Sequence, residues 1–198
     1  MKSNVVDLRQ LLTTKSILES ICTWNAVRYN QEHNEKLTID LLYEELNETL
    51  EAMQALNQIE TCDGFGDVFF VAIGALWKMG ISDKEMGEYI DSVDSSLPLV
   101  PPTPVAVQWV SYDCNTYTLA VVALAAVADL TDLLDSSDAA FDVIRAICES
   151  NNSKVVKKTE AGVKANIDKG ENYFAPTRQI AKILLDVNKG VYNARKSH

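Results

Sequence analysis

The chain has 198 residues, of which 47% are hydrophobic, and its net charge at neutral pH is −10. This composition can build a buried core and excludes a disordered tail. The acidic balance disfavours a nucleic-acid polymer or an anionic membrane as a partner, because both are themselves negatively charged.

Three further features predict a cytoplasmic protein. The N-terminal residues have no apolar segment of the kind found in secretory signals. The longest apolar run, residues 119–128, is too short to span a bilayer. The cysteines form no CxxC pair and lie in apolar surroundings, which favours buried reduced thiols. They are Cys22, Cys62, Cys114 and Cys148.

Helical periodicity predicts four helices in the first half of the chain, at residues 17–30, 38–56, 59–79 and 82–93. We expect Thr38 to cap the second helix, and Asn57 to end it in the left-handed conformation. Gly80 closes the third helix, and Ser82 with Glu85 forms a capping box for the fourth.

The second half of the chain begins with a segment, residues 95–104, that holds four of the five prolines and predicts a linker. Residues 105–110 suggest a short strand. Apolar patterns then predict helices at 116–134 and 137–152, and Pro176 opens a last helix in its first turn. Residues 153–174 show no clear period and are rich in lysine. The fold class is therefore predicted to be all-α.

Two carboxylate clusters are the best indication of function. Glu45 and Glu48 are three residues apart, and Asp63 and Asp67 are four apart, so each pair shares one face of its helix. Like charges stacked in this way repel unless a cation lies between them, and carboxylate oxygens suit Mg²⁺ or Mn²⁺. The alternative is a solvated acidic face.

The apolar neighbours of these clusters weaken the alternative of a solvated face, as do two glycines inside a helical pattern. Gly64 and Gly66 each cost about 1 kcal/mol relative to alanine, so a packing or ligand reason is expected. A turn centred near residues 57 and 58 places Glu48 opposite Asp67. Glu44 then lies beside the ligands and is a candidate for acting on water.

These residues resemble the motifs of the all-α nucleoside triphosphate pyrophosphohydrolases. That superfamily includes MazG-like proteins, dimeric dUTPases and phosphoribosyl-ATP pyrophosphohydrolases. The commoner second motif of the family is ExxD, whereas this chain has Gly64 at the glutamate position and Asp63 one residue earlier, a DxxxD variant of phage-type members. The motifs read Glu44-Glu45-Leu46-Asn47-Glu48 and Asp63-Gly64-Phe65-Gly66-Asp67.

A second block also resembles the phage-type members. Its segments are Ser150-Asn151-Asn152-Ser153-Lys154, residues 163–170 and Tyr173-Phe174-Ala175-Pro176. The resemblance implies one MazG-like helical bundle with three parts: metal-binding helices at 17–94, a proline-rich linker and an extra inserted helix at 95–135, and a lysine-rich substrate segment with the C-terminal helix at 136–198.

The resemblance implies Mg²⁺-dependent hydrolysis of a nucleoside triphosphate, in particular a deoxynucleoside triphosphate, to a monophosphate and pyrophosphate. Glu45, Glu48, Asp63 and Asp67 are the implied metal ligands, with Glu44 as the residue that orients or deprotonates water. The complementary residues for the substrate are Asn151, Lys154, Lys164, Lys169 and Tyr173. Lys157 and Lys158 fit a solvated loop better, and Trp24 fits the core better than a base-stacking platform.

Two other functions remain open from the sequence. One is hydrolysis of phosphoribosyl-ATP, and the other is nucleotide binding or sequestration without turnover, which the loss of the ExxD glutamate favours. The chain is also expected to form a homo-oligomer, a dimer or tetramer, because a lone hairpin would expose Ile73, Leu76 and Trp77. The inserted helix at 116–134 offers a second way to cover these residues, within one chain.

Overall fold

The computed structural model describes residues 15–27, 32–156 and 167–192. These residues form eight helices and one antiparallel pair of two-residue strands, so the predicted all-α class is confirmed. The elements are α2 (Lys15–Val27), α3 (Glu35–Gln54), α4 (Gln58–Lys78), α5 (Met86–Ser96), α6 (Thr103–Tyr112), α7 (Thr116–Leu134), α8 (Ser137–Ser153), β1 (Val155–Val156), β2 (Ile167–Asp168) and α9 (Thr177–Asn188).

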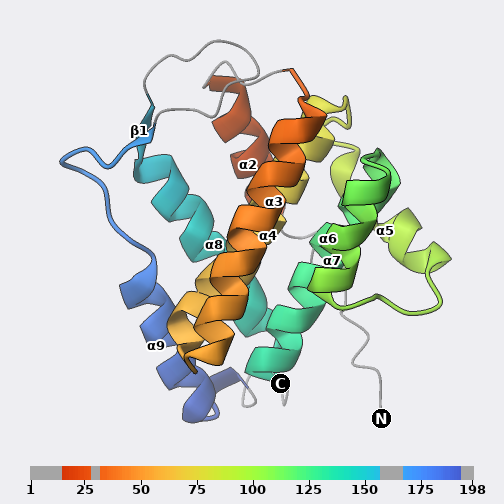
Figure 1. The fold of residues 1–198 in the computed structure, drawn as a ribbon. Coiled ribbons are helices and arrows are strands. Elements are labelled where there is room, and N and C mark those ends of the chain that lie inside the picture. The colour runs from red at the N-terminus through yellow and green to blue at the C-terminus, as the bar shows by residue number, and fades with distance from the viewer. Residues whose placement is uncertain (1–14, 28–31, 157–166, 193–198) are drawn as a thin grey trace.

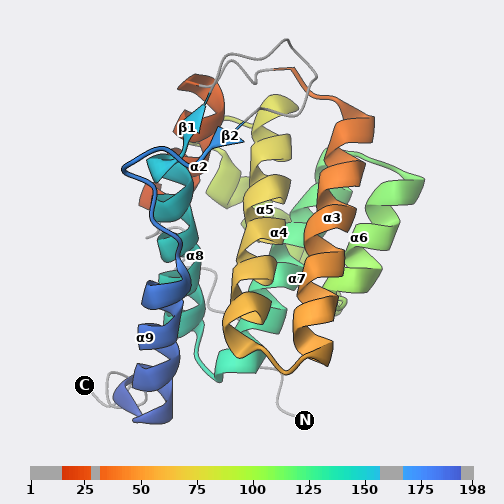
Figure 2. The same cartoon turned by 60° about the vertical axis from the view of Figure 1, so that its left-hand side comes forward.

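Helix α4 is the centre of the bundle. It packs against α2, α3, α7, α8 and α9, and Figure 1 and Figure 2 show these helices arranged around it. Its apolar side chains point in several directions, and Phe69, Ile73 and Leu76 are almost fully buried. A helix that is apolar on most sides is stable only when other helices cover it.

The hairpin of α3 and α4 differs from prediction at both caps. Asn34, not Thr38, caps α3, because its side chain accepts the Leu37 N–H at 2.9 Å. At the turn Leu56 has a φ of 56°, and Asn57 is the N-cap of α4, accepting the Glu60 N–H. The predicted left-handed conformation of Asn57 is therefore wrong, since its side chain serves the following helix instead.

The predicted end of α4 is confirmed, because Gly80 follows the helix with a φ of 98°. The predicted capping box of Ser82 and Glu85 is wrong: the Ser82 hydroxyl donates to the Glu85 carboxylate, while α5 begins at Met86 with no side-chain cap. Helix α2 agrees with its prediction up to Val27, and residues 28–30 lie outside the described part.

Residues 105–110 form part of helix α6, so the suggested strand is wrong. The first turn of α6 is stabilised by a residue distant in sequence, because the Thr103 N–H donates to the Asp129 carboxylate of α7 at 2.8 Å. Ala106, Val107 and Val110 are buried. A short apolar run can be helix or strand, and here a tertiary contact decides.

Helix α7 covers α4 from within the same chain, and it has the predicted bounds. It is long and apolar enough to cross a membrane by length and composition, but 72% of its apolar window is buried in this fold, as in a core helix. Ile73 and Leu76 are consequently buried, so the expectation that they form an exposed surface is wrong.

The C-terminal part is built on α8, whose predicted bounds hold to within a residue or two. After α8, Val155 pairs with Asp168 and Val156 with Ile167. The connection to α9 is fixed on α8, because the Ser150 hydroxyl donates to the Phe174 carbonyl at 3.0 Å. This places α9 beside α8 and near the α3–α4 turn, as Figure 2 shows.

Candidate active site

The carboxylates of α3 and α4 share one stretch of the hairpin. A Cβ atom on Gly64 would lie 2.1 Å from Oγ1 of Thr49, so these two residues face each other across the helices. Pairing 49 with 64 places Leu46 level with Asp67, and Glu45 one residue further from the turn. The predicted pairing of Glu48 with Asp67 is therefore wrong by about one residue in each helix, because the turn lies at Leu56 and not at Asn57 and Gln58.

The carboxylates of α3 and α4 are close enough to raise one another's pKa values. Burial, followed by the charge of Asp67, raises the pKa of Glu45 to about 8. Burial and the same aspartate raise the pKa of Asp63 to about 7. Burial also raises the pKa of Asp67, while the Lys154 charge and a hydrogen bond from the Asn151 side chain oppose this shift. Like charges held together in partial burial favour a bound cation or proton.

One oxygen in this group suits a cation directly. Oδ1 of Asp63 is buried and has no hydrogen-bond partner among the described residues. Buried polar atoms are normally satisfied, so such an oxygen is available to a hard metal ion. Within the described residues no three His, Cys, Asp or Glu side chains already form a closed ligand set. The oxygen donors nevertheless fit Mg²⁺ or Mn²⁺ in type.

The two remaining acidic residues are more open. Glu44 and Glu48 are exposed on α3, whereas Glu45, Asp63 and Asp67 are half-buried. The charge of Glu44 contributes to the raised pKa of Glu45, and that of Glu48 contributes to the raised pKa values of Glu45, Asp63 and Asp67. Both therefore lie beside the buried carboxylates and remain accessible to solvent.

Asn151, on α8, makes hydrogen bonds to α2 and α4 beside the carboxylates. Its side chain accepts a hydrogen bond from Lys154 Nζ at 2.7 Å, and its carbonyl accepts one from Trp24 Nε1 at 3.0 Å. Trp24 is buried and packs edge-on against Phe70, with 5.3 Å between the ring centroids, so it belongs to the core as predicted. The end of α8 thus holds the Lys154 ammonium beside the carboxylates of α3 and α4.

A cavity of about 160 Å³ extends from this group between α2, α3 and α4. The carboxylate end is lined by Glu45, Asp67, Asn151 and Lys154. Lys78 also lines the cavity, further along α4. Sequence reasoning missed Lys78. The signal was available, since eleven residues after Asp67 is about three helical turns, which returns to the same face of α4.

The other predicted substrate residues lie elsewhere or outside the described part. Lys169 is exposed and its Nζ lies 5.0 Å from the centre of the Tyr173 ring, and neither residue lines this cavity. Lys164 falls outside the described residues, as do Lys157 and Lys158. Of the five predicted substrate residues, the structure brings Asn151 and Lys154 to the cavity.

The two glycines of the second motif have packing reasons. Gly64 meets Thr49 of α3, and a Cβ on Gly66 would lie 2.0 Å from Cδ1 of Ile147 on α8. The approach of α3 to α4 therefore requires glycine at residue 64, where Cβ and the backbone of Thr49 are also close, whereas at residue 66 the end of the flexible Ile147 side chain can move aside.

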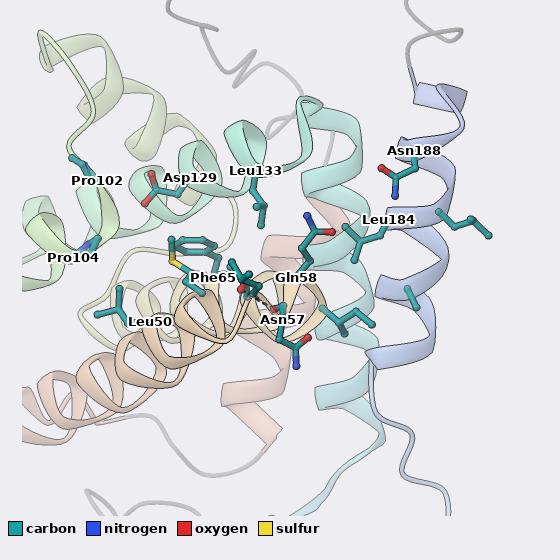
Figure 3. Close-up of a pocket in the computed structure, with 16 residues that line it drawn as sticks. Leu50, Asn57, Gln58, Phe65, Pro102, Pro104, Asp129, Leu133, Leu184 and Asn188 are labelled. Atoms are coloured by element: carbon teal, nitrogen blue, oxygen red, sulfur yellow. Dashed lines mark hydrogen bonds between the residues drawn. The ribbon is translucent and has the colours of Figure 1, made fainter.

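A larger hollow lies at the other end of the hairpin. This apolar groove, of about 950 Å³, lies between the α3–α4 turn, α6, α7 and α9, and Figure 3 shows its labelled side chains, among them Leu50, Phe65 and Leu184. None of the carboxylates of the two motifs lines it. We therefore place the candidate active site at the smaller cavity.

Comparison with known proteins gives one finding, and it concerns the part of the chain that contains both acidic motifs. Residues 15–94, which contain both acidic motifs, match the family model of phosphoribosyl-ATP pyrophosphohydrolase. A search of curated proteins and a search of solved structures gave no match. Members of this family are hydrolases that act on phosphoric anhydrides and generally depend on Mg²⁺. Residues 15–94 thus match the phosphoribosyl-ATP pyrophosphohydrolase family, which is part of the all-α nucleoside triphosphate pyrophosphohydrolase superfamily.

Proposed function

We propose that the chain hydrolyses a nucleoside triphosphate, in particular a deoxynucleoside triphosphate of the cellular pool, to a monophosphate and pyrophosphate with Mg²⁺. The observation that carries this proposal is the position of Glu45 and Asp67. They are crowded with other carboxylates, their pKa values are raised, and both line a cavity beside Lys154. A triphosphate can approach such an acidic group only with divalent cations between them.

Glu45, Glu48, Asp63 and Asp67 would hold Mg²⁺, for which Mn²⁺ can substitute. When bound, the ion neutralises phosphate charge and lowers the pKa of water. Glu48 is exposed and Asp63 has an unsatisfied oxygen, so both have ligand capacity that the protein itself does not use. We assign Glu44, exposed beside Glu45, to orienting or deprotonating the attacking water.

The substrate side of the proposal rests on the end of α8. Asn151 fixes the Lys154 ammonium, which can then contact phosphate oxygens as a point charge. The cavity is smaller than the ~300–1,000 Å³ of pockets that enclose a drug-sized ligand. It therefore suits the base and the sugar, with the phosphates at the Lys154 end. Lys164, Lys169 and Tyr173 stay proposed contacts from the segment that follows.

Two alternatives have an observation in their favour. Phosphoribosyl-ATP as the substrate is favoured by the description of the matching family model. Binding without turnover is favoured by Gly64, because the contact with Thr49 leaves no room for a glutamate ligand at that position.

The test is release of pyrophosphate with Mg²⁺ across a panel of ribo- and deoxyribonucleoside triphosphates and phosphoribosyl-ATP. Turnover of triphosphates with monophosphate as the second product supports the proposal. Turnover of phosphoribosyl-ATP alone would select the first alternative. Tight nucleotide binding with no pyrophosphate from any compound would select the second.

The organisation of the protein follows from the same proposal. The three parts, 17–94, 95–135 and 136–198, act as one domain, which is supported by a single core cluster reaching from Ile17 to Tyr192. We propose a homo-oligomer with the apolar groove as the contact surface, since Leu56 and Leu185 line it and are exposed. A cytoplasmic location fits the free thiols of the described cysteines.

A further inference from the structure

Lys78 is half-buried at the C-terminal end of α4. Its position indicates a second contact with the substrate, separate from the phosphate contacts at Lys154. No hydrogen bond or ion pair joins it to another described residue, although it lines the cavity together with Asn25, Asn34 and Thr38. Burial lowers the pKa of Lys78 to about 8. A lysine withdrawn from water without a carboxylate partner has donor capacity that a ligand can use.

The position of Lys78 limits which part of a nucleotide could reach it. Asp67, Val71, Gly74 and Lys78 line the cavity in succession along one face of α4. Asp67 and Lys78 are eleven residues apart, which is about 16 Å along a helix. The phosphates belong at the Asp67 end, where Lys154 and the carboxylates lie. Only the far end of a nucleotide, the base, would then extend towards Lys78.

The surroundings of Lys78 favour a polar contact there. Trp24 and Phe70 contribute apolar surface to the cavity lining. The polar residues that line the cavity beside Gly74 and the start of α3 are Asn25, Glu32, Asn34 and Thr38. Asn25 is held there by its bond to the Ile21 carbonyl at 2.9 Å, and Gly74 lets it approach α4 closely.

We propose that the Lys78 ammonium binds the carbonyl oxygen of the substrate base and so selects oxo-substituted bases over amino-substituted ones. The inference rests on the proposed function, whose substrate class it narrows. A lysine ammonium has three donors and no acceptor. It therefore pairs with the oxygen of uracil, thymine, hypoxanthine or guanine, whereas the amino group of adenine or cytosine presents a second donor. A site built to bond one group discriminates against an analogue that lacks it.

The experiment uses two pairs of nucleotides that differ at this one position. Inosine and adenosine triphosphates differ as 6-oxo and 6-amino purines, and deoxyuridine and deoxycytidine triphosphates as 4-oxo and 4-amino pyrimidines. We expect the wild type to favour the oxo member of a pair by about tenfold or more in kcat/KM. This applies to the purine pair or the pyrimidine pair, whichever the protein hydrolyses. Lys78→Met should abolish this ratio, and Lys78→Arg should keep part of it.

The control is Lys36→Met, because Lys36 is exposed on α3 in an ion pair with Asp40 and does not line the cavity. It should leave the ratio unchanged. An unaltered oxo-to-amino ratio in Lys78→Met would overturn the inference, even if overall activity falls. The same ratio is measured for binding of the corresponding monophosphates by calorimetry, without metal. If no triphosphate is hydrolysed but this binding ratio depends on Lys78, the proposed function fails and the inference stands.

Discussion

Gly64 and Thr49 bring α3 and α4 into closer contact than any side chain on residue 64 permits. Even a Cβ would lie 2.1 Å from Oγ1 and 2.9 Å from Cβ of Thr49. The glutamate of the commoner ExxD motif therefore has no room in this hairpin. Asp63, one residue earlier, lies beside the other carboxylates instead, with one buried oxygen unsatisfied. Glycine in place of the ExxD glutamate thus goes together with the close packing of α3 on α4.

Gly64→Ala should lower the free energy of unfolding by about 1–3 kcal/mol, the usual cost of overpacking, despite the better helix propensity of alanine. Thr49→Ala should restore part of the loss, because it removes Oγ1 and leaves Cβ. Urea unfolding of the two single variants and the double variant measures the coupling. Strictly additive effects would contradict the contact.

Replacing Glu48 or Asp67 with alanine should reduce pyrophosphate release by at least about a hundredfold if each binds Mg²⁺. The fold should survive, because removing one carboxylate relieves repulsion in the metal-free protein. Circular dichroism checks the fold. Glu51→Ala is the matched control, since Glu51 is exposed on α3 and belongs to neither motif. Full activity in both variants would disprove the ligand assignment.

Stability of the metal-free protein should fall as pH rises from about 4 towards 8. Burial and neighbouring carboxylates raise the pKa of Glu45 from 4.5 to about 8 and that of Asp63 from 3.8 to about 7. In this range the folded protein binds more protons than the unfolded chain, so deprotonation destabilises it. Thermal unfolding across pH with chelator measures the slope.

The same groups set the pH dependence of metal binding. Mg²⁺ must displace the protons, so its stabilising effect should increase with pH over the same interval. Glu45→Gln should flatten the metal-free slope, whereas Glu51→Gln should not. A metal-free Tm that rises with pH in the wild type would show that these carboxyls are not protonated in the folded state.

Lys154→Ala should raise the KM for a triphosphate about tenfold, because its ammonium is held at the cavity by Asn151. Affinity for Mn²⁺ without nucleotide, measured above the pKa values of the carboxyls, should not fall, since lysine and metal have charges of the same sign. Steady-state kinetics and separate metal titrations check both results. Lys84→Ala, on the exposed surface before α5, is the control. Equal nucleotide affinity in Lys154→Ala and wild type would assign Lys154 to a solvated role.

Leu56→Asp and Leu185→Asp should convert an oligomer into monomers without loss of the fold. Leu56 is 88% exposed and Leu185 is 50% exposed, and both line the apolar groove. Burying a charge in a contact between copies is unfavourable. Light scattering after size-exclusion chromatography measures the mass. Leu99→Asp, 74% exposed and outside the groove, is the control. A monomeric wild type at high concentration would contradict the homo-oligomer.

The sequence alone determined the parts of this protein that depend on neighbours in the chain. Helical periodicity placed α7 at residues 116–134 and α4 to within a residue or two, because amphipathic spacing and a following glycine are local signals. The spacing of Glu45 with Glu48 and of Asp63 with Asp67 is also local, and it identified the acidic clusters and the superfamily that the family model supports.

Tertiary structure decided what depends on contacts between distant residues. The position of the turn, at Leu56, placed Glu45 nearer than Glu48 to the level of Asp67. Asp129 stabilised the start of α6 where the pattern had suggested a strand, and α7 covered Ile73 and Leu76. Lys78 became a cavity residue only because α2 and α3 withdraw it from water. Burial and register arise from packing in three dimensions, which periodicity along one chain does not encode.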